Sequence, residues 1–412
     1  MQDVDLLVNN IGQLLTVPLR PAEENIESKL GFISRGAIAV RDGKIVWVGK
    51  HEDIHREIRS FQREIDAKNQ VVCPAFIDAH THISGYPYGR ADDFEVRVFG
   101  SENYAGIAKK GGGIRTTIER TQKTSSEELQ NHAKRIADEF MRHGVGTIEA
   151  KSGYGLNKEN EMRQIQIINK LASSHSMTIV PTYLAHVLDP SLSRNEYVQN
   201  IIEDIIPSIC EIIESIDIFC DTIAFSVEET QKIVEAALNK KRFVSVHADQ
   251  TSPFKGAEVL APMGVTSLSH LEHINDSGIE MMRKHNTIAI IFPTCSLHLN
   301  APYSPYEKFS KAGIRVALST DWNPGSSPCS NILLVGYFAA KYLRMPLHEV
   351  MRSITIHPAS ALHRDSSLGS LEVEKYADFC IFELQDWRDL FTQCGNTPGL
   401  TLFKKGNIVL QS

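Results

Sequence analysis

The chain has 412 residues, with 43 Lys and Arg against 50 Asp and Glu, a formal net charge of −7 and 42% hydrophobic residues. This composition is that of a globular protein, and it excludes the collagen-like, coiled-coil and intrinsically disordered classes. The negative charge offers no basic surface to nucleic acid or to an anionic membrane, so we expect a small-molecule partner. The length fits a (β/α)8 barrel of about 250 residues with an accessory domain.

The seven cysteines are scattered and contain no C-x-x-C pair. That pattern is typical of reduced thiols rather than of a disulfide scaffold or a cysteine zinc site. Residues 1–7 lack the basic start and apolar core of a signal peptide, and no apolar run approaches the ~18 residues of a membrane span. We therefore expect a cytoplasmic protein, and we expect it to form a homodimer.

Two β-rich runs near the start of the chain, 37–40 and 44–48, flank an Asp-Gly pair. Asp-Gly between such runs predicts a hairpin, because glycine tolerates the positive φ of a tight turn. β-rich runs return near the other end, at 377–384 and 402–410. We predict that both chain ends, 1–66 and 366–412, combine into one small β-sandwich domain.

Between these ends, over residues 67–365, short apolar runs alternate with helical patterns. The first run covers 71–78, and Ser226 with Glu229 predicts a capping box at the start of one helix. Repeated strand and helix units predict a parallel sheet covered by helices. Eight strands can be placed, which predicts a TIM-like (β/α)8 barrel. Their expected ends lie near Asp78, Glu149, His186, Asp221, His247, His270, Pro293 and Asp321.

Histidines and one aspartate fall at the ends of these strands, where barrel enzymes carry their chemistry. His80 and His82 follow the first strand and share a face, since they are two apart on an extended segment. His247 ends the fifth strand and Asp321 the eighth. Neutral imidazoles with one carboxylate suit zinc or iron. We predict that these four residues bind a catalytic metal; the alternative is that the first two are surface or capping histidines.

The chemistry of water activation divides the roles at such a site. A metal ion lowers the pKa of bound water to about 7, so hydroxide is the expected nucleophile. Asp321 would touch both ion and water and is the predicted general base. His270, at the end of the sixth strand, is predicted to orient the hydroxide and stabilise the oxyanion. The alternative for His270 is a core histidine bonded to Ser269 or His273.

A second metal ion would need a bridging carboxylate or a modified lysine on the fourth strand. That strand ends Phe219-Cys220-Asp221 and has no lysine. We therefore expect one zinc or iron ion per chain. Lys151, which follows the second strand, is expected to contact the substrate or to form a structural salt bridge.

Residues 74–82 read PAFIDAHTH and, with the later histidines and aspartate, resemble the amidohydrolase superfamily. Within it the chain is similar to the imidazolonepropionase family, through GGGI at 111–114, KSGYGL at 151–156 and DWNPGSSP at 321–328. The similarity extends over nearly the whole chain. It implies a hydrolase of histidine degradation that opens the cyclic amide of 4-imidazolone-5-propanoate to N-formimidoyl-L-glutamate.

The same resemblance implies a set of residues that hold the substrate. Arg90 offers a planar fork for the propionate carboxylate, the alternative being an arginine that covers a surface loop. For the aromatic members the alternative is core packing, and for the Asn-Pro-Gly segment it is ordinary turn chemistry. The glycines at 111–113 form either a mobile flap or a plain loop. The other implied substrate residues are Tyr154, His186, Gln250, Asn323, Gly325 and Ser326.

One departure from the family concerns proton transfer. Members of the family can carry glutamate where this chain has Gln250, and glutamine cannot act as a base. Gln250 would then only orient the substrate, and Asp321 and His270 would carry the proton transfer. One alternative is a deaminase or another cyclic-amide hydrolase of the superfamily, which Arg90, Tyr154 and Asn323 disfavour. A second alternative is a non-catalytic assembly protein built on the same barrel.

Overall fold

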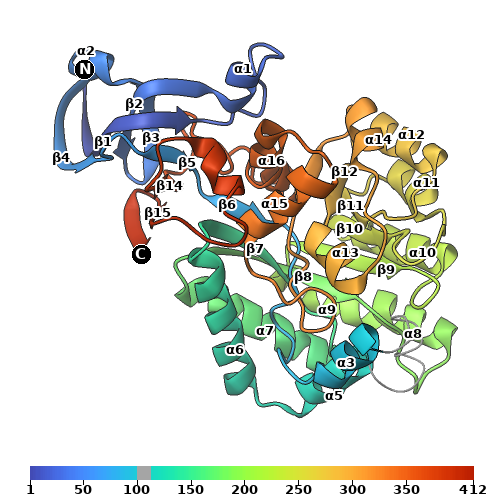
Figure 1. Ribbon diagram of the computed structural model, residues 1–412. Helices are drawn as coiled ribbons and strands as arrows, with labels where there is room; N and C mark the ends of the chain where they lie inside the picture. The colour runs from blue at the N-terminus through green and yellow to red at the C-terminus, as the bar shows by residue number, and fades with distance from the viewer. Residues whose placement is uncertain (100–112) are drawn as a thin grey trace.

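The protein contains two eight-stranded sheets, which the computed structural model describes over residues 1–99 and 113–412 (Figure 1). One sheet is parallel and runs in chain order from β6 to β13, and the other combines strands from both chain ends. The predicted barrel with a small β domain is therefore confirmed. Gly111 and Gly112 of the predicted glycine flap or loop lie outside the described residues.

The parallel sheet forms the wall of the barrel, and its strands are short and buried on both faces, as parallel strands under helices must be. All seven residues of β7 are buried, for example. The strands are β6 (Phe76–Asp78), β7 (Val145–Lys151), β8 (Thr178–Ala185), β9 (Ser215–Cys220), β10 (Phe243–Ala248), β11 (Ser267–His270), β12 (Ile288–Ile291) and β13 (Val316–Leu318).

The first and last barrel strands meet through a few contacts instead of a continuous ladder. Thr81 and Trp322 form a single parallel bridge, and the amide of His82 donates to the carbonyl of Trp322 at 2.9 Å. The buried carboxylate of Asp78 accepts a bond from the amide of Thr320 at 3.0 Å. These bonds bring the histidine segment after β6 alongside the segment after β13.

The run 71–78, predicted as one barrel strand, is divided between the two sheets. β5 (Val71–Pro74) pairs with the strands of the mixed sheet, and the barrel strand β6 starts only after Ala75. The amide of Ala75 donates to the carbonyl of Asp378, while Pro74 has no N–H to continue a ladder. The sequence did not reveal this break because both halves are fully buried and equally apolar.

The mixed sheet joins the two chain ends as one hydrogen-bonded sheet, and its halves share an apolar core that includes Leu6, Ile38, Phe379 and Phe403. The predicted Asp-Gly hairpin joins β2 to β3, with φ of 52° and 74° at its two turn residues. Besides β5, the strands of the mixed sheet are β1 (Gln2–Leu15), β2 (Phe32–Arg41), β3 (Lys44–Lys50), β4 (Ile58–Asp66), β14 (Phe379–Phe382), β15 (Leu400–Lys404) and β16 (Asn407–Gln411).

Most helices surround the barrel (Figure 1), but α1 and α2 connect strands of the mixed sheet. The predicted capping box of Ser226 and Glu229 is present at the start of α10. Among the described helices, none is both long and apolar enough to cross a membrane. They are α1 (Ile26–Leu30), α2 (Ile54–Glu57), α3 (Ala91–Phe99), α5 (Ile114–Lys123), α6 (Ser126–Met141), α7 (Lys158–Ser174), α8 (Arg194–Asn200), α9 (Ile206–Ile209), α10 (Val227–Asn239), α11 (Gly256–Leu260), α12 (Asp276–His285), α13 (Pro293–Leu299), α14 (Tyr306–Lys311), α15 (Ile332–Tyr342), α16 (Leu347–Ser353) and α17 (Ile356–Ala361).

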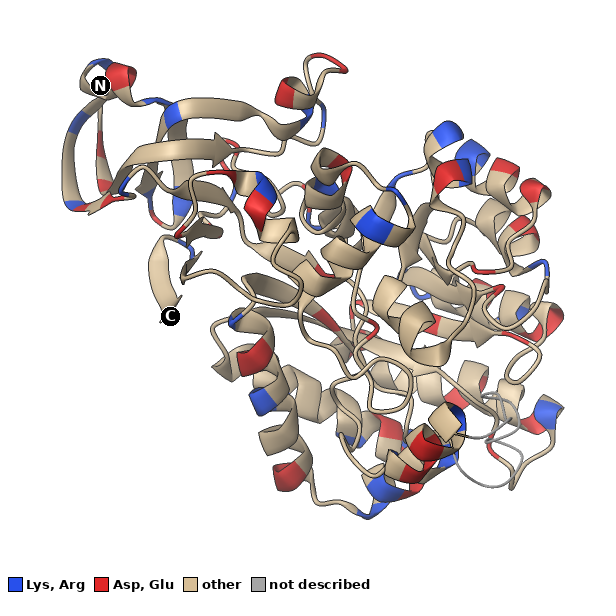
Figure 2. Cartoon of the chain, viewed as in Figure 1, with Lys and Arg blue, Asp and Glu red and all other residues tan. Residues whose placement is uncertain are grey.

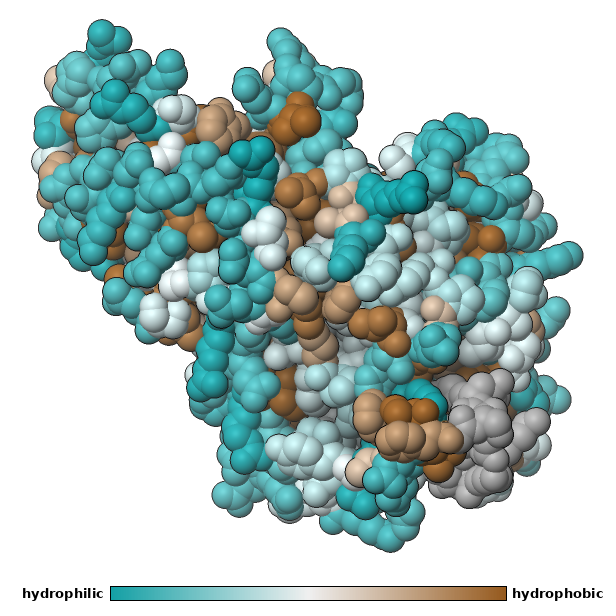
Figure 3. All heavy atoms as spheres, viewed as in Figure 1, coloured by the Kyte–Doolittle hydropathy of each residue, from teal (hydrophilic) through white to brown (hydrophobic). Residues whose placement is uncertain are grey.

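Exposed apolar side chains gather on α3, as Figure 3 shows by its brown group in the region of that helix. They belong to Phe94, Val96, Val98 and Phe99. Helix α3 begins directly after Arg90, so these exposed apolar residues follow closely on the predicted substrate arginine in the chain. Figure 2 shows that acidic and basic residues are interspersed along the outer helices.

One buried ion pair fastens the mixed sheet to the barrel. Lys404 of β15 pairs with Asp378, and both side chains are 7% exposed. The Lys404 ammonium also donates to the carbonyl of Gly146 at 2.8 Å and to Oγ1 of Thr178 at 3.0 Å, at the starts of two barrel strands. A buried charge needs such partners, because its desolvation is costly.

We expect Lys404→Met to lower the free energy of unfolding by about 3–5 kcal/mol, because it leaves the Asp378 carboxylate buried without its partner. Chemical denaturation measures this loss. The matched control is Lys123→Met, which removes an exposed ion pair with Glu119 and is expected to cost about 1 kcal/mol or less. Equal losses in the two variants would contradict the fastening role.

Candidate active site

A pocket lies at the carboxyl ends of the barrel strands, where the predicted site residues come together. Every one of them lines it except His80, which lies fully buried behind the wall. The pocket also has an apolar side that the sequence did not predict, made by Ile114, Phe219 and Leu299. The complete lining is His82, Arg90, Ile114, Tyr154, His186, Phe219, His247, Gln250, His270, Leu299, Asp321, Asn323, Gly325 and Ser326.

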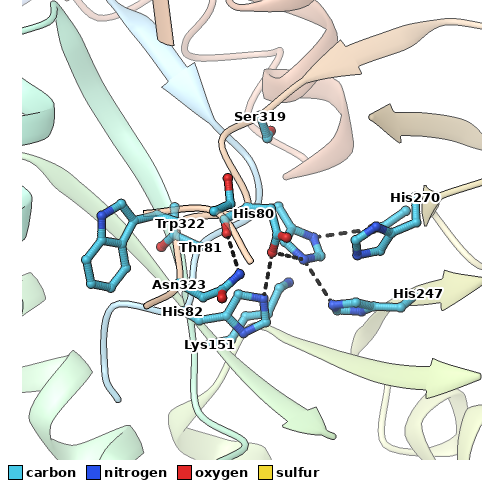
Figure 4. A network of polar contacts seen from close by, with 12 residues as sticks. His80, Thr81, His82, Lys151, His247, His270, Ser319, Trp322 and Asn323 are labelled. Atoms are coloured by element: carbon cyan, nitrogen blue, oxygen red, sulfur yellow. Dashed lines mark hydrogen bonds and ion pairs between the residues drawn. The ribbon is translucent and has the colours of Figure 1, made fainter. Parts of the chain in front are cut away.

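His82 and His247 lie next to His80 (Figure 4), and Asp321, the fourth predicted metal ligand, contacts both His80 and His82. Nε2 of His80 lies 3.1 Å from Nε2 of His247 and 3.7 Å from Oδ1 of Asp321, and Nε2 of His82 lies 3.2 Å from the same oxygen. Two overlapping groups have ligand atoms within 4.8 Å of one another: His80, His82 and Asp321, and His80, His247 and His270. His80 belongs to both, and His270, predicted to act on water only, also lies within reach.

The facing imidazoles have the protonation that a metal site requires. Burial lowers the pKa of His247 to about 4 and that of His80 well below its ordinary value, so both rings are neutral. Asp217 Oδ1 lies 3.1 Å from Nδ1 of His247, and a carboxylate only accepts, so Nδ1 carries the hydrogen and Nε2 keeps its lone pair. Ser269 Oγ, 3.3 Å from Nδ1 of His80, allows the same tautomer there. These donors fit a divalent metal ion.

Asp321 follows β13 in the left-handed region, with φ of 53°, which sets the direction of its carboxylate. Burial opposes its ionisation, but the contact with His82 holds the pKa of Asp321 below its ordinary value. The Asn323 side chain holds the segment that follows Asp321. Its Nδ2 donates to the Asp321 carbonyl, and its Oδ1 accepts from the backbone amides of Gly325 and Ser326. These bonds support the turn alternative for Asn323, although the residue also lines the pocket.

Arg90 is 9% exposed, so its guanidinium is largely buried. Its Nε contacts Asp93, and Nη1 donates to Oγ1 of Thr117 at 3.1 Å. Its Nη2 is buried and has no hydrogen-bond partner among the described residues. A Cβ at Gly325 would lie 2.4 Å from Nη1, so this position needs glycine for the guanidinium to reach the pocket wall. The surface alternative for Arg90 is therefore wrong.

Two aromatic groups stack beside the metal-ligand candidates. The ring of His186 lies parallel to that of His82, with centroids 5.5 Å apart, and Tyr154 meets His186 edge to face at 5.4 Å. Burial lowers the pKa of His186 well below its ordinary value, so this ring is neutral. Both rings line the pocket, and aromatic faces and edges of this kind suit contact with an unsaturated ring.

Glu272, which the sequence analysis overlooked, stands behind His270. His270 and Leu271 both have left-handed backbones, with φ of 74° and 66°, and Ser304 Oγ donates to the carbonyl of His270 at 2.5 Å. This turn places Glu272 Oε1 3.5 Å from Nδ1 of His270. Although burial favours the neutral ring, Glu272 and Asp321 raise the pKa of His270. The group next to Nδ1 of His270 is therefore Glu272, and not Ser269 or His273 as the alternative had it.

Lys151 forms a structural salt bridge, which was one of its two predicted roles. Its ammonium lies 2.6 Å from Oε1 of Glu149 and 2.7 Å from Oδ2 of Asp217. Burial favours neutral forms, but these contacts raise the pKa of Lys151, and His247 and Lys151 lower that of Asp217. Lys151 does not line the pocket. The charged Asp217 within the apolar strand β9 was a signal in the sequence that we did not use.

The comparisons with known proteins agree on one family. The model of the amidohydrolase family matches residues 71–409. An imidazolonepropionase of Caldanaerobacter subterraneus subsp. tengcongensis is 35% identical over 98% of both chains, and one of Parabacteroides distasonis is 34% identical over the full length of both. An adenosine deaminase of Xanthomonas campestris with bound zinc has the same fold, with a TM-score of 0.73 and 15% identity over 100% of this chain and 94% of that one.

The overlap of the two ligand groups leads to a test of the ligand set. We expect His80→Ala to weaken zinc binding more than the ~10–100-fold typical of an outer partner, because His80 belongs to both groups. His270→Ala leaves the four predicted ligands in place and is expected to retain zinc. Elemental analysis after dialysis measures both variants. If His270→Ala loses zinc as fully as His80→Ala, His270 belongs to the ligand set.

Proposed function

The chain belongs to the amidohydrolase family and, within it, to the imidazolonepropionases, and on this basis we propose how its own residues carry out the reaction. It is a hydrolase of histidine degradation that opens the cyclic amide of 4-imidazolone-5-propanoate to N-formimidoyl-L-glutamate. The observation that carries the proposal is that Arg90 Nη2, which has no hydrogen-bond partner in the described part of the chain, lies in the same pocket as the cluster of histidines and Asp321.

We propose that His80, His82, His247 and Asp321 hold one zinc or iron ion per chain. When bound, this ion supplies Lewis-acid activation of a water molecule and of the ring carbonyl. Two observations support this ligand set: the convergence of the side chains on His80, and the neutral tautomer that Asp217 imposes on His247.

The proton is moved by residues of the pocket floor. The water oxygen adds to the carbonyl carbon, and Asp321 takes the proton that the water loses. The carbon–nitrogen bond then breaks, and Asp321 returns the proton to the departing ring nitrogen. His270, with Glu272 behind it, stabilises the oxyanion of the tetrahedral intermediate. Gln250 can only orient the ring through its amide.

The substrate is held by polar and aromatic residues that line the pocket. Arg90 Nη2 donates to the propionate carboxylate, a charged hydrogen bond that fixes the tail. Tyr154 and His186 pack against the ring, and Gly325 and Ser326 close the side next to Arg90.

Further statements about the protein in its cell also remain proposals. We propose a cytoplasmic enzyme that acts on a small molecule and not on nucleic acid, in keeping with its net charge of −7 and its seven unpaired cysteines. The homodimer and the domain limits at 66/67 and 365/366 remain predictions.

The direct test follows the loss of imidazolone absorbance with the purified metal-loaded enzyme. Asp321→Asn keeps an oxygen near the ligand set but removes the base, and we expect kcat to fall by about 10²–10⁴-fold. Asp276→Asn, on an exposed carboxylate, is the control and should leave kcat unchanged. If the enzyme deaminates a purine or pyrimidine and does not turn over the imidazolone, the proposed function is wrong. A near-normal kcat in Asp321→Asn would show that Asp321 is not the base.

Arg90→Ala is expected to raise KM by about 10–100-fold with a smaller effect on kcat, because a hydrogen bond to a charged group contributes about 1.5–3 kcal/mol. Steady-state kinetics with the natural substrate and with an imidazolone lacking the propionate measure the difference. The truncated compound should have the same KM with both enzymes. An unchanged KM for the natural substrate would disprove the role of Arg90.

A further inference from the structure

Three buried charged side chains beneath the metal-ligand candidates have no part in the steps proposed above. Lys151, Asp217 and Glu149 are each at most 2% exposed. The Lys151 ammonium lies between the two carboxylates, 2.7 Å from Oδ2 of Asp217 and 2.6 Å from Oε1 of Glu149. Figure 4 shows Lys151 next to the histidine cluster. Burying charged groups of this kind costs desolvation free energy, so their place beneath the histidines calls for an explanation.

The Asp217 side of this group controls one histidine. Asp217 uses its two oxygens differently: Oδ1 lies 3.1 Å from Nδ1 of His247, and Oδ2 faces Lys151. The contact with His247 fixes both the ring orientation and the tautomer. The position of the Asp217 carboxylate therefore decides where Nε2 of His247 points.

The Glu149 side controls the other two histidines. Thr81, which stands between His80 and His82, donates from its amide to Oε2 of Glu149 at 3.3 Å and from Oγ1 to the Glu149 carbonyl at 2.6 Å. The backbone amide of Lys151 donates to the carbonyl of Thr81 at 3.0 Å. The segment from His80 to His82 is thus held by the same pair of residues.

Direct contact of Lys151 with the substrate does not fit this geometry. The side chain is 1% exposed, does not line the pocket, and has its ammonium engaged by two carboxylates. A protonated amine in that position is also not available as a metal ligand. Its remaining route to the reaction is through the residues that it holds.

We infer that Lys151 is a positioning residue that joins the two halves of the metal-ligand set, through Asp217 to His247 and through Glu149 to the His80–His82 segment. The inference rests on the metal site of the proposed function. Without the ammonium, Asp217 and Glu149 lose the charge that draws them together and repel each other in a buried space. Each carboxylate then turns away, and the histidines that they hold separate.

The test compares Lys151→Met with Lys151→Arg and with the wild type, each loaded with zinc or with cobalt(II). We expect Lys151→Met to weaken zinc binding about 10- to 100-fold in a chelator competition and to change the visible absorption spectrum of bound cobalt(II). Lys151→Arg keeps the charge and should recover part of the affinity. Zinc affinity and the cobalt spectrum report the ligand geometry directly, and a purely structural lysine would not change them in a folded protein.

Lys404→Met is the matched control, because it also removes a buried, ion-paired lysine, but far from the ligands. It should leave zinc affinity and the cobalt(II) spectrum unchanged at temperatures where the protein is folded. If Lys151→Met does not fold, Asp217→Asn replaces it, with the same expected loss of zinc.

Two outcomes separate this inference from the proposed function. A wild-type enzyme that binds no metal would refute the proposed function itself. A wild type that binds zinc, with a folded Lys151→Met that binds it equally and gives the same cobalt(II) spectrum, would refute only the role of Lys151. Equal loss of zinc in Lys404→Met would also refute it, because the effect would then follow stability.

Discussion

Two imidazole nitrogens, Nε2 of His80 and Nε2 of His247, face each other at 3.1 Å in the interior of the barrel. Burial keeps both rings neutral, and the Asp217 carboxylate fixes the hydrogen of His247 on the far nitrogen. Such an arrangement of lone pairs is stable in a protein when a cation lies between them. The residues that line the pocket, with the proposed base and substrate residues among them, are arranged around this point.

The fold produces this convergence where the first and last barrel strands meet. There a side-chain bond and a single backbone bridge take the place of a continuous ladder. Asp78 accepts from the amide of Thr320, and the Thr81 segment bridges to Trp322, so the first and last strands align without pairing along their length. Side-chain bonds tolerate an irregular backbone, which the sharp turn at Asp321 requires. The irregular seam and the position of the Asp321 carboxylate therefore have one cause.

Acidic groups at the site are placed by tertiary contacts more than by sequence motifs. Gln250 lines the pocket without a carboxylate, whereas Glu272 contacts His270 through two consecutive left-handed residues. Asp217 contacts His247 from the neighbouring strand. A glutamine at one position of the pocket is thus compatible with a site in which buried carboxylates already orient two histidines.

The sequence by itself determined the barrel, the small β domain from both chain ends and the histidines and aspartate at the strand ends, because strand periodicity, the Asp-Gly hairpin and polar residues at strand ends are local patterns. The other polar residues of the pocket followed from the resemblance to the family, and its apolar side was not predicted. Only the tertiary structure decided how 71–78 divides between two sheets, that Asn323 is engaged in its own turn, and that Lys151, Asp217 and Glu272 support the histidines. Those features depend on contacts across strands and on backbone φ values, and no run of adjacent residues encodes the distance between side chains that meet only after the barrel closes.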